Sequence, residues 1–180
     1  MNPYRLFLGD QRAVDVIQVT AERLRELANS IGPAGWDQSF APGKWTARQV
    51  ICHLADVEIA FAFRLRQAAA EDHHMIQPFD QDSWATPYTK LDVNAAVAIF
   101  AAVRLWNLLF VGALPPEILQ KPVSHPERGT MTIETILETM GGHDRNHLEQ
   151  LELIRSNELQ RSSPTRPSKE MLCQIKSMMK

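Results

Sequence analysis

Apolar residues recur at steps of three and four along four long stretches of the chain, which is the spacing of one face of an α-helix. These stretches cover about residues 11–29, 46–70, 93–111 and 132–156. Helices of this length can each bury one apolar face against the others. The pattern therefore predicts an all-α fold, a four-helix bundle of the up-and-down type with long crossover loops.

Local signals mark where these helices begin and end. Thr46 and Gln49 have the spacing of a capping box, in which each side chain satisfies a backbone N–H of the first turn. Asp92 is a candidate N-cap of the third helix, and Thr132 opens the fourth. The first helix is expected to stop at the breaker that runs from residue 29 to Pro33.

The segments between and after the helices complete the prediction. The links 71–91 and 113–131 read as crossovers without strands, because Pro and Asp interrupt every β-branched run. Gly141 and Gly142 each cost a helix about 1 kcal/mol relative to alanine, so we expect a close approach of another helix or a ligand there. Residues 1–180 are expected to form one domain, with its core at about 11–156. In the C-terminal extension, 157–180, Ser168 would cap a short extra helix.

Composition and charge argue against several classes of function. The chain has 19 basic and 21 acidic residues and no run of five like charges, so no nucleic-acid partner is expected. The longest apolar stretch ends at Arg104, and the apolar piece near the N-terminus ends at Asp10, so neither a membrane span nor a signal peptide is expected. Cytoplasmic localisation follows as the expectation. Cys52 and Cys173 form no disulfide framework, and Cys52 is expected to be a buried apolar filler.

Three of the six histidines fall on helix faces that point into the predicted bundle. His143 and His147 are four residues apart, which places their β-carbons about 5–6 Å apart on one face. His53 lies between apolar residues of the second helix. Burying three imidazoles is costly unless their nitrogens are satisfied, and one divalent ion satisfies all three. Because a helical His pair is more often on the surface or satisfied within the core, the geometry alone leaves both interpretations open.

Two sequence blocks resemble the DinB-like (DinB/YfiT) family. The stretch Trp45–Glu58 is similar to the family's tryptophan followed by a helix with His-Leu-x-Asp, and Gly142–Leu151 is similar to its H-x-x-x-H-x-x-Q block. The resemblance covers about residues 14–154. It implies a four-helix bundle with a long crossover, whose metal ion is held by His53, His143 and His147. That ion would be nickel or zinc, with iron or manganese as further candidates.

Neighbours of the histidines are candidates for supporting roles. Asp56 lies one turn after His53 and could bond a ligand imidazole or act as a base, although a carboxylate on a helix can equally pair with an arginine or water. Asp144 and Gln150 are candidate acceptors for the second ring nitrogen of a metal ligand. His125 is expected to be exposed, although it could reach over the site.

The resemblance also implies a range of activities. Family members include bacillithiol- and mycothiol-dependent transferases and isomerases, and bundles named as hydrolases. Three His ligands leave a coordination position open, as in catalytic sites. We therefore expect an enzyme that acts on a small molecule through a metal-activated thiolate or water, with a slight preference for transfer from a low-molecular-weight thiol. The alternative is a non-catalytic, metal-binding or regulatory bundle. A homodimer is expected, because the apolar residues of the tail need cover.

Overall fold

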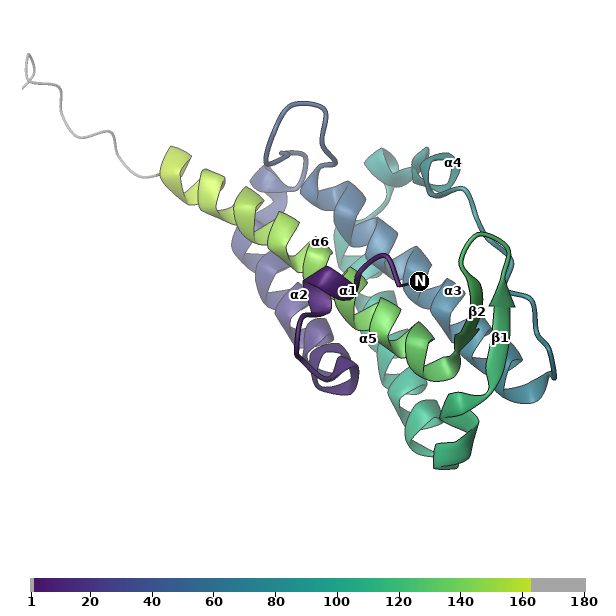
Figure 1. Cartoon of the computed structure of the whole chain (residues 1–180). Helices are drawn as coiled ribbons and strands as arrows, with labels where there is room; N and C mark the ends of the chain where they lie inside the picture. Colours follow the sequence, from purple (N-terminus) through teal and green to yellow (C-terminus); the bar gives the residue numbers. More distant parts are fainter. Residues whose placement is uncertain (1, 163–180) are drawn as a thin grey trace, which may run out of the picture.

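The computed structural model describes residues 2–162, and its elements follow one another from the N-terminal α1 to the long C-terminal α6 (Figure 1). The helices and 3₁₀ turns are α1 (Arg5–Leu8), α2 (Ala13–Gly35), α3 (Ala47–Ala70), α4 (Gln81–Ala85), η1 (Tyr88–Lys90), α5 (Val93–Gly112), η2 (Pro116–Gln120) and α6 (Ile133–Ser162). The strands are β1 (Pro122–His125) and β2 (Gly129–Thr132). The short helix expected at Ser168 lies outside the described residues.

Four long helices, α2, α3, α5 and α6, pack as a bundle, as the sequence predicted. Helix α2 contacts mainly α6 and α5, and α3 contacts mainly α5 and α6. Although α2 and α3 are consecutive in the chain, they share few contacts and lie across the bundle from each other. The order around the bundle therefore differs from the simple up-and-down order that we expected.

The predicted helix starts are confirmed where local hydrogen bonds define them. Thr46 and Gln49 make both bonds of the capping box, and the Asp92 carboxylate accepts the backbone N–H of Ala95 at 2.7 Å. The breaker near residue 33 bends the chain without ending the first helix. Gly32 has φ +67°, outside the helical region, and a last turn follows it to Gly35. Helix α6 also extends one to two turns beyond the predicted end, to Ser162.

The second crossover contains an antiparallel hairpin, so the prediction that no strand occurs was wrong. Strands β1 and β2 pair from Pro122↔Thr132 to His125↔Gly129. Proline does not interrupt this pair, because Pro122 is the first residue of its strand and Pro126 lies in the turn. The first crossover supports the hairpin, since the backbone N–H of Ile76 donates to the carbonyl of Ser124 at 2.8 Å.

The close approach that Gly141 and Gly142 predicted is confirmed at the N-terminal segment. A β-carbon on Gly142 would lie 2.3 Å from the carbonyl oxygen of Tyr4, and one on Gly141 would lie 3.1 Å from Leu8 Cδ1. The segment around α1 therefore lies directly on α6, where Figure 1 shows it crossing that helix. Leu8 is buried in this contact.

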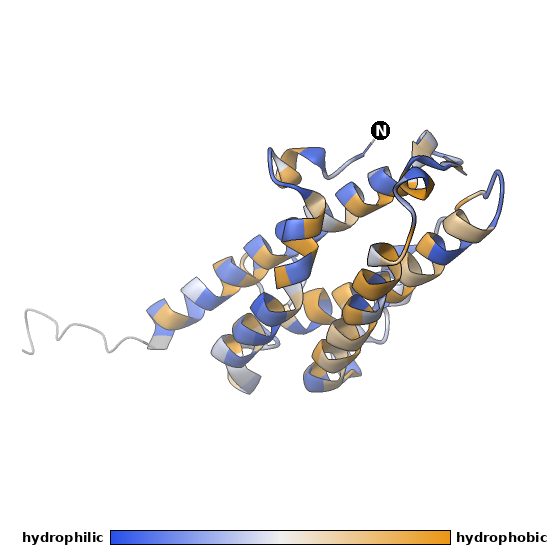
Figure 2. Ribbon diagram, turned by 90° about the horizontal axis from the view of Figure 1, so that it is seen from below, coloured by the Kyte–Doolittle hydropathy of each residue, from blue (hydrophilic) through white to orange (hydrophobic). Residues whose placement is uncertain are grey.

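A buried polar layer separates two apolar clusters of the core. One cluster includes Leu27, Val50, Phe100 and Ile154, and the other includes Leu65, Ile76, Met131 and Leu137. The buried polar side chains between them are Thr20, His53, Glu58, Arg104, Asn107, His143, Asp144 and His147. Figure 2 shows that hydrophilic and hydrophobic residues alternate along α6, the helix that leads to the grey trace.

Helix α5 is apolar on more than its packed face. By length and composition it could cross a membrane, a property that core helices of soluble proteins share. One face is buried through Val93, Phe100 and Arg104, whereas Leu105 and Trp106 are exposed. Helix α5 thus combines a face packed in the bundle with an exposed apolar face.

Candidate metal centre

Two helices bring the three predicted histidines together in the polar layer. His53 lies on α3, and His143 and His147 lie one turn apart on α6. The Nε2 atoms of His53 and His143 are 3.0 Å apart, and one ring nitrogen from each of the three side chains lies within 4.8 Å of the others. All three residues are buried, with exposed fractions of 2%, 4% and 6%. Within residues 2–162, this is the group of His, Cys, Asp or Glu side chains with the spacing of a metal site.

Burial keeps these imidazoles neutral. It lowers the pKa of His53 to about 3, with a smaller contribution from His147, and it lowers the pKa of His147 to about 4. The pKa of His143 is also lowered well below its ordinary value, first by burial and then by the two other histidines. A neutral imidazole has a free electron pair on one nitrogen, which is the form that binds metal.

The donor set fits one divalent ion of the kind that prefers nitrogen ligands. A tetrahedral ion with bonds of 2.0–2.1 Å places its ligand atoms about 3.3 Å apart, close to the 3.0 Å between Nε2 of His53 and Nε2 of His143. His147 Nδ1 donates to Gln150 Oε1 at 3.1 Å, which leaves Nε2 of His147 unprotonated. His53 Nδ1 is buried and has no hydrogen-bond partner among the described residues.

Aromatic rings surround the histidines and hold their orientation. The ring of Trp45 lies edge-on to His53 at 4.8 Å between centroids and is stacked on His147 at 6.5 Å. Tyr4, from the segment that crosses α6, contacts the ring of His143 edge-on at 5.1 Å. These rings restrict water and fix the imidazole planes on two sides. No sequence pattern pointed to Tyr4, because its position depends on packing against Gly142.

The predicted supporting residues have different places in the structure. Gln150 contacts His147, as described above. Asp56 points to another partner and accepts the hydroxyl hydrogen of Tyr88 at 2.7 Å. Asp144 is bonded to the buried Arg104, with Asp144 Oδ2 2.6 Å from Nη1. The contact that we considered for Asp56 and Asp144, to a histidine of the triad, is absent among the hydrogen bonds of residues 2–162.

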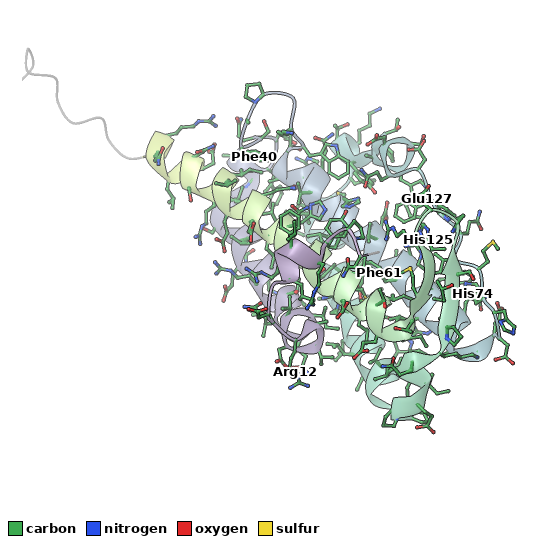
Figure 3. The ribbon with its side chains drawn as sticks, viewed as in Figure 1. Arg12, Phe40, Phe61, His74, His125 and Glu127 are labelled. Carbon is green, nitrogen blue, oxygen red and sulfur yellow. The ribbon has the colours of Figure 1, made fainter. Side chains whose placement is uncertain are left out.

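A pocket of about 160 Å³ opens beside the triad and includes residues that sequence reasoning missed. His53 and His143 form part of its wall, together with Phe61 of α3. The hairpin contributes His125 and Glu127, which Figure 3 labels on the same side of the bundle as Phe61. His125 is 6% exposed, so our expectation that it is exposed was wrong, because the unpredicted hairpin folds it inward.

Cys52 is buried beside the triad and is a poor nucleophile. Burial raises the pKa of its thiol to about 11, with a further contribution from the charge of Asp56. A thiol with such a pKa is protonated at neutral pH. The interpretation of Cys52 as a packed core residue agrees with this environment.

A model of the DinB superfamily matches residues 17–151, a span that includes all three histidines and the helices that carry them. The chain belongs to the DinB superfamily. A protein of Oceanobacillus iheyensis named "Putative metal-dependent hydrolase" is 31% identical over 113 residues, which cover 62% of this chain and 66% of that protein. A Bacillus mycoides protein with the same descriptive name is 30% identical over 145 residues, which cover 77% of this chain and 83% of that protein.

A solved structure shares the fold of this DinB superfamily member. YfiT from Bacillus subtilis, described as "a probable metal-dependent hydrolase with an unusual four-helix bundle topology", superposes with a TM-score of 0.76 and 19% identity. The match covers 81% of this chain and 85% of YfiT. The family resemblance and the bundle fold predicted from the sequence are thus confirmed.

Proposed function

We propose that this DinB superfamily protein is a metal-dependent enzyme that acts on a small molecule. One observation carries the proposal: the three buried, neutral imidazoles of His53, His143 and His147 converge beside a pocket that holds a carboxylate and two arginines. A purely structural site has no need of such a pocket. The names of the relatives, which describe metal-dependent hydrolases, agree with this proposal.

His53, His143 and His147 would hold the ion, for which the family resemblance favours nickel or zinc. Imidazole suits zinc, nickel, iron and copper, whereas magnesium and calcium prefer oxygen ligands. Three protein ligands leave room for a further ligand, as in catalytic zinc sites. When bound, a divalent ion lowers the pKa of a coordinated water to about 7, keeps a coordinated thiol deprotonated at neutral pH, and polarises an electrophile.

The chain's own residues favour water as the nucleophile. Hydrolysis needs a group that takes a proton from water, and Glu127 is the carboxylate among the residues that line the pocket. Glu127 would accept that proton and then pass it to the leaving group. Asp56, the base considered from the sequence, is held by Tyr88 instead.

Transfer from a low-molecular-weight thiol is the second candidate, which the sequence resemblance favours. Cys52 cannot supply that thiol, because its sulfur is buried and protonated. The thiolate would therefore come from a second small molecule bound beside the triad. Both candidates use the same three histidines, and they differ in whether turnover requires an added thiol.

Turnover assays with the metal-loaded protein distinguish the candidates. We would incubate zinc- or nickel-loaded protein with ester and amide substrates, and with chloro-dinitrobenzene in the presence and absence of bacillithiol, mycothiol and glutathione. Hydrolysis without thiol, lost in His53→Ala and reduced about a hundredfold in Glu127→Gln with unchanged metal content, is the expected result. His74→Ala is the matched control, since His74 bonds Glu71 at the far end of α3.

Other outcomes have equally definite meanings. Turnover that requires an added thiol and disappears in His53→Ala would replace hydrolysis by thiol transfer. No turnover in either set of assays, with the metal bound, would contradict the enzymatic proposal and favour a metal-binding or regulatory bundle.

A further inference from the structure

The pocket beside the triad extends away from the histidines toward two arginines. Its far wall includes Arg64 of α3 and Arg128 of the turn between β1 and β2. One face of α3 carries four of the pocket residues at helical spacing: His53, Val57, Phe61 and Arg64. Helical side chains lean toward the N-terminus, and Arg64 therefore leans back toward His53.

Arg64 has no carboxylate partner within residues 2–162. Its Nη2 donates to the carbonyl oxygen of Gln77 at 3.0 Å, and its guanidinium lies 5.2 Å from the ring centroid of Phe79. Both contacts hold the side chain in place without neutralising its charge. Burial lowers the pKa of Arg64, and the charge of Arg128 lowers it further. The two like charges therefore repel each other within the pocket.

His125 adds a neutral hydrogen-bond donor to the same wall. Its Nδ1 accepts the backbone N–H of Glu127 at 3.2 Å, so the ring proton of the neutral imidazole lies on Nε2. Burial, followed by Arg128 and Arg64, lowers the pKa of His125, which keeps the ring neutral at pH 7. Glu127 is the carboxylate among the residues that line this pocket, beside the guanidinium groups of Arg64 and Arg128.

We propose that this pocket binds an anionic group, a carboxylate or a phosphate, of the small molecule whose reacting end meets the three histidines. The proposal rests on the proposed function and adds the substrate class. An anion between Arg64 and Arg128 would relieve the repulsion of these partly desolvated charges and accept charge-assisted hydrogen bonds. Arginine suits this role because its planar group matches a carboxylate or phosphate.

The geometry also sets the shape of the ligand. Arg64 lies eleven positions after His53, which corresponds to about 16 Å between their α-carbons. Because the arginine side chain covers part of this distance, the anionic group lies several bonds from the reacting group. The pocket therefore selects an elongated acidic molecule over a compact neutral one.

Binding of matched hydroxamates to the zinc-loaded protein tests this inference without any turnover. The hydroxamate end binds zinc, and the other end carries either a carboxylate, a phosphonate or a neutral carboxamide of the same length. We expect the better anionic probe to bind at least about tenfold more tightly than the carboxamide, as for a charge-assisted contact. Comparison of the carboxylate with the phosphonate identifies which anion the pocket prefers.

Arginine variants test whether the preference for the anionic probes comes from this pocket. Arg64→Gln and Arg128→Gln should bring the ratio of the two dissociation constants close to one, while the affinity for the carboxamide probe stays the same. Arg64→Lys should retain part of the preference. The control is Arg12→Gln, which removes one positive charge at the exposed start of α2, far from the hairpin (Figure 3).

A metal-free arm separates failure of this inference from failure of the proposed function. Line broadening of inorganic phosphate in ³¹P spectra reports weak binding to the metal-free protein, and we expect it to decrease in Arg64→Gln. If hydroxamate binding is independent of zinc while the phosphate effect persists, the metal proposal fails and the anion site stands. Equal affinities for charged and neutral probes, or an unchanged preference in Arg64→Gln and Arg128→Gln, would overturn the anion site.

Discussion

Arg104 and Asp144 form a buried ion pair that links the helices around the triad, with Nη1 2.6 Å and Nη2 3.2 Å from the two carboxylate oxygens. The guanidinium also bonds Glu58 of α3 at 2.7 and 2.9 Å and the carbonyl oxygen of Ile17 of α2 at 3.0 Å. One side chain of α5 therefore contacts all three other long helices. Because Asp144 is adjacent to His143, this contact also fixes the rotation of α6.

Replacing Arg104 by methionine should destabilise the protein strongly. Burial opposes the charge of Arg104, but Asp144 and Glu58 raise its pKa above the usual value, so the guanidinium stays charged. Removal of the arginine leaves two buried carboxylates without a counter-charge, at a cost of about 3–5 kcal/mol. Urea denaturation measures this loss. Arg25→Met, at an exposed pair with Glu22, should cost under about 1 kcal/mol, and a similar small loss for Arg104→Met would contradict the assignment.

Gly142→Ala should displace the N-terminal segment from α6. The new methyl group would collide with the backbone of Tyr4, and the overlap should cost more than the roughly 1 kcal/mol that alanine contributes in a helix. We expect faster tryptic cleavage at Arg5 and Arg12 in this variant. Gly112→Ala is the control, because a β-carbon there meets no atom within 4 Å. Equal cleavage rates in the two variants would rule out the close contact.

The stability of the metal-free protein should fall with acidification. In the unfolded chain, histidine takes up protons below about pH 6.5, whereas His147 and His53 in the folded chain have pKa values of about 4 and about 3. The unfolded state thus binds more protons between these limits, and each histidine lowers the free energy of unfolding by up to about 1.4 kcal/mol per pH unit. Urea denaturation near pH 7 and pH 5 measures the slope, which should be smaller in His53→Asn. A slope that this substitution leaves unchanged would contradict the neutral, buried state of His53.

The features that could be predicted are those whose contacts join residues close together in the sequence. The capping box of Thr46 and Gln49 depends on neighbouring residues, and so does the contact of His147 with Gln150 three residues later. The partner of Asp144 could not be predicted in the same way. Asp144 lies about 100° around α6 from His143, and only the packing of α5 brings Arg104 to it. The hairpin could not be predicted for the same reason. Its strand β1 is hydrogen-bonded to the backbone of Ile76, which is distant in the sequence.

Self-association remains a prediction, and the structure suggests where to test it. The exposed face of α5 carries Ile99, Leu105, Trp106 and Leu109. Clustered exposed apolar side chains mark interaction surfaces. Light scattering should give twice the 20.4 kDa chain mass, and Trp106→Glu should shift the mass toward one chain. Val19→Glu, an exposed apolar position on α2, is the control. A wild-type mass of one chain would exclude the dimer.

The metal content of the purified, tag-free protein tests the central claim most directly. Elemental analysis should find about one divalent ion per chain, because His53, His143 and His147 present three neutral nitrogens to one point. The ion should be lost in His147→Ala and retained in His74→Ala, and it should raise the melting temperature of the wild type. A protein that contains no ion, and whose melting temperature is unchanged by added zinc or nickel, would contradict the account.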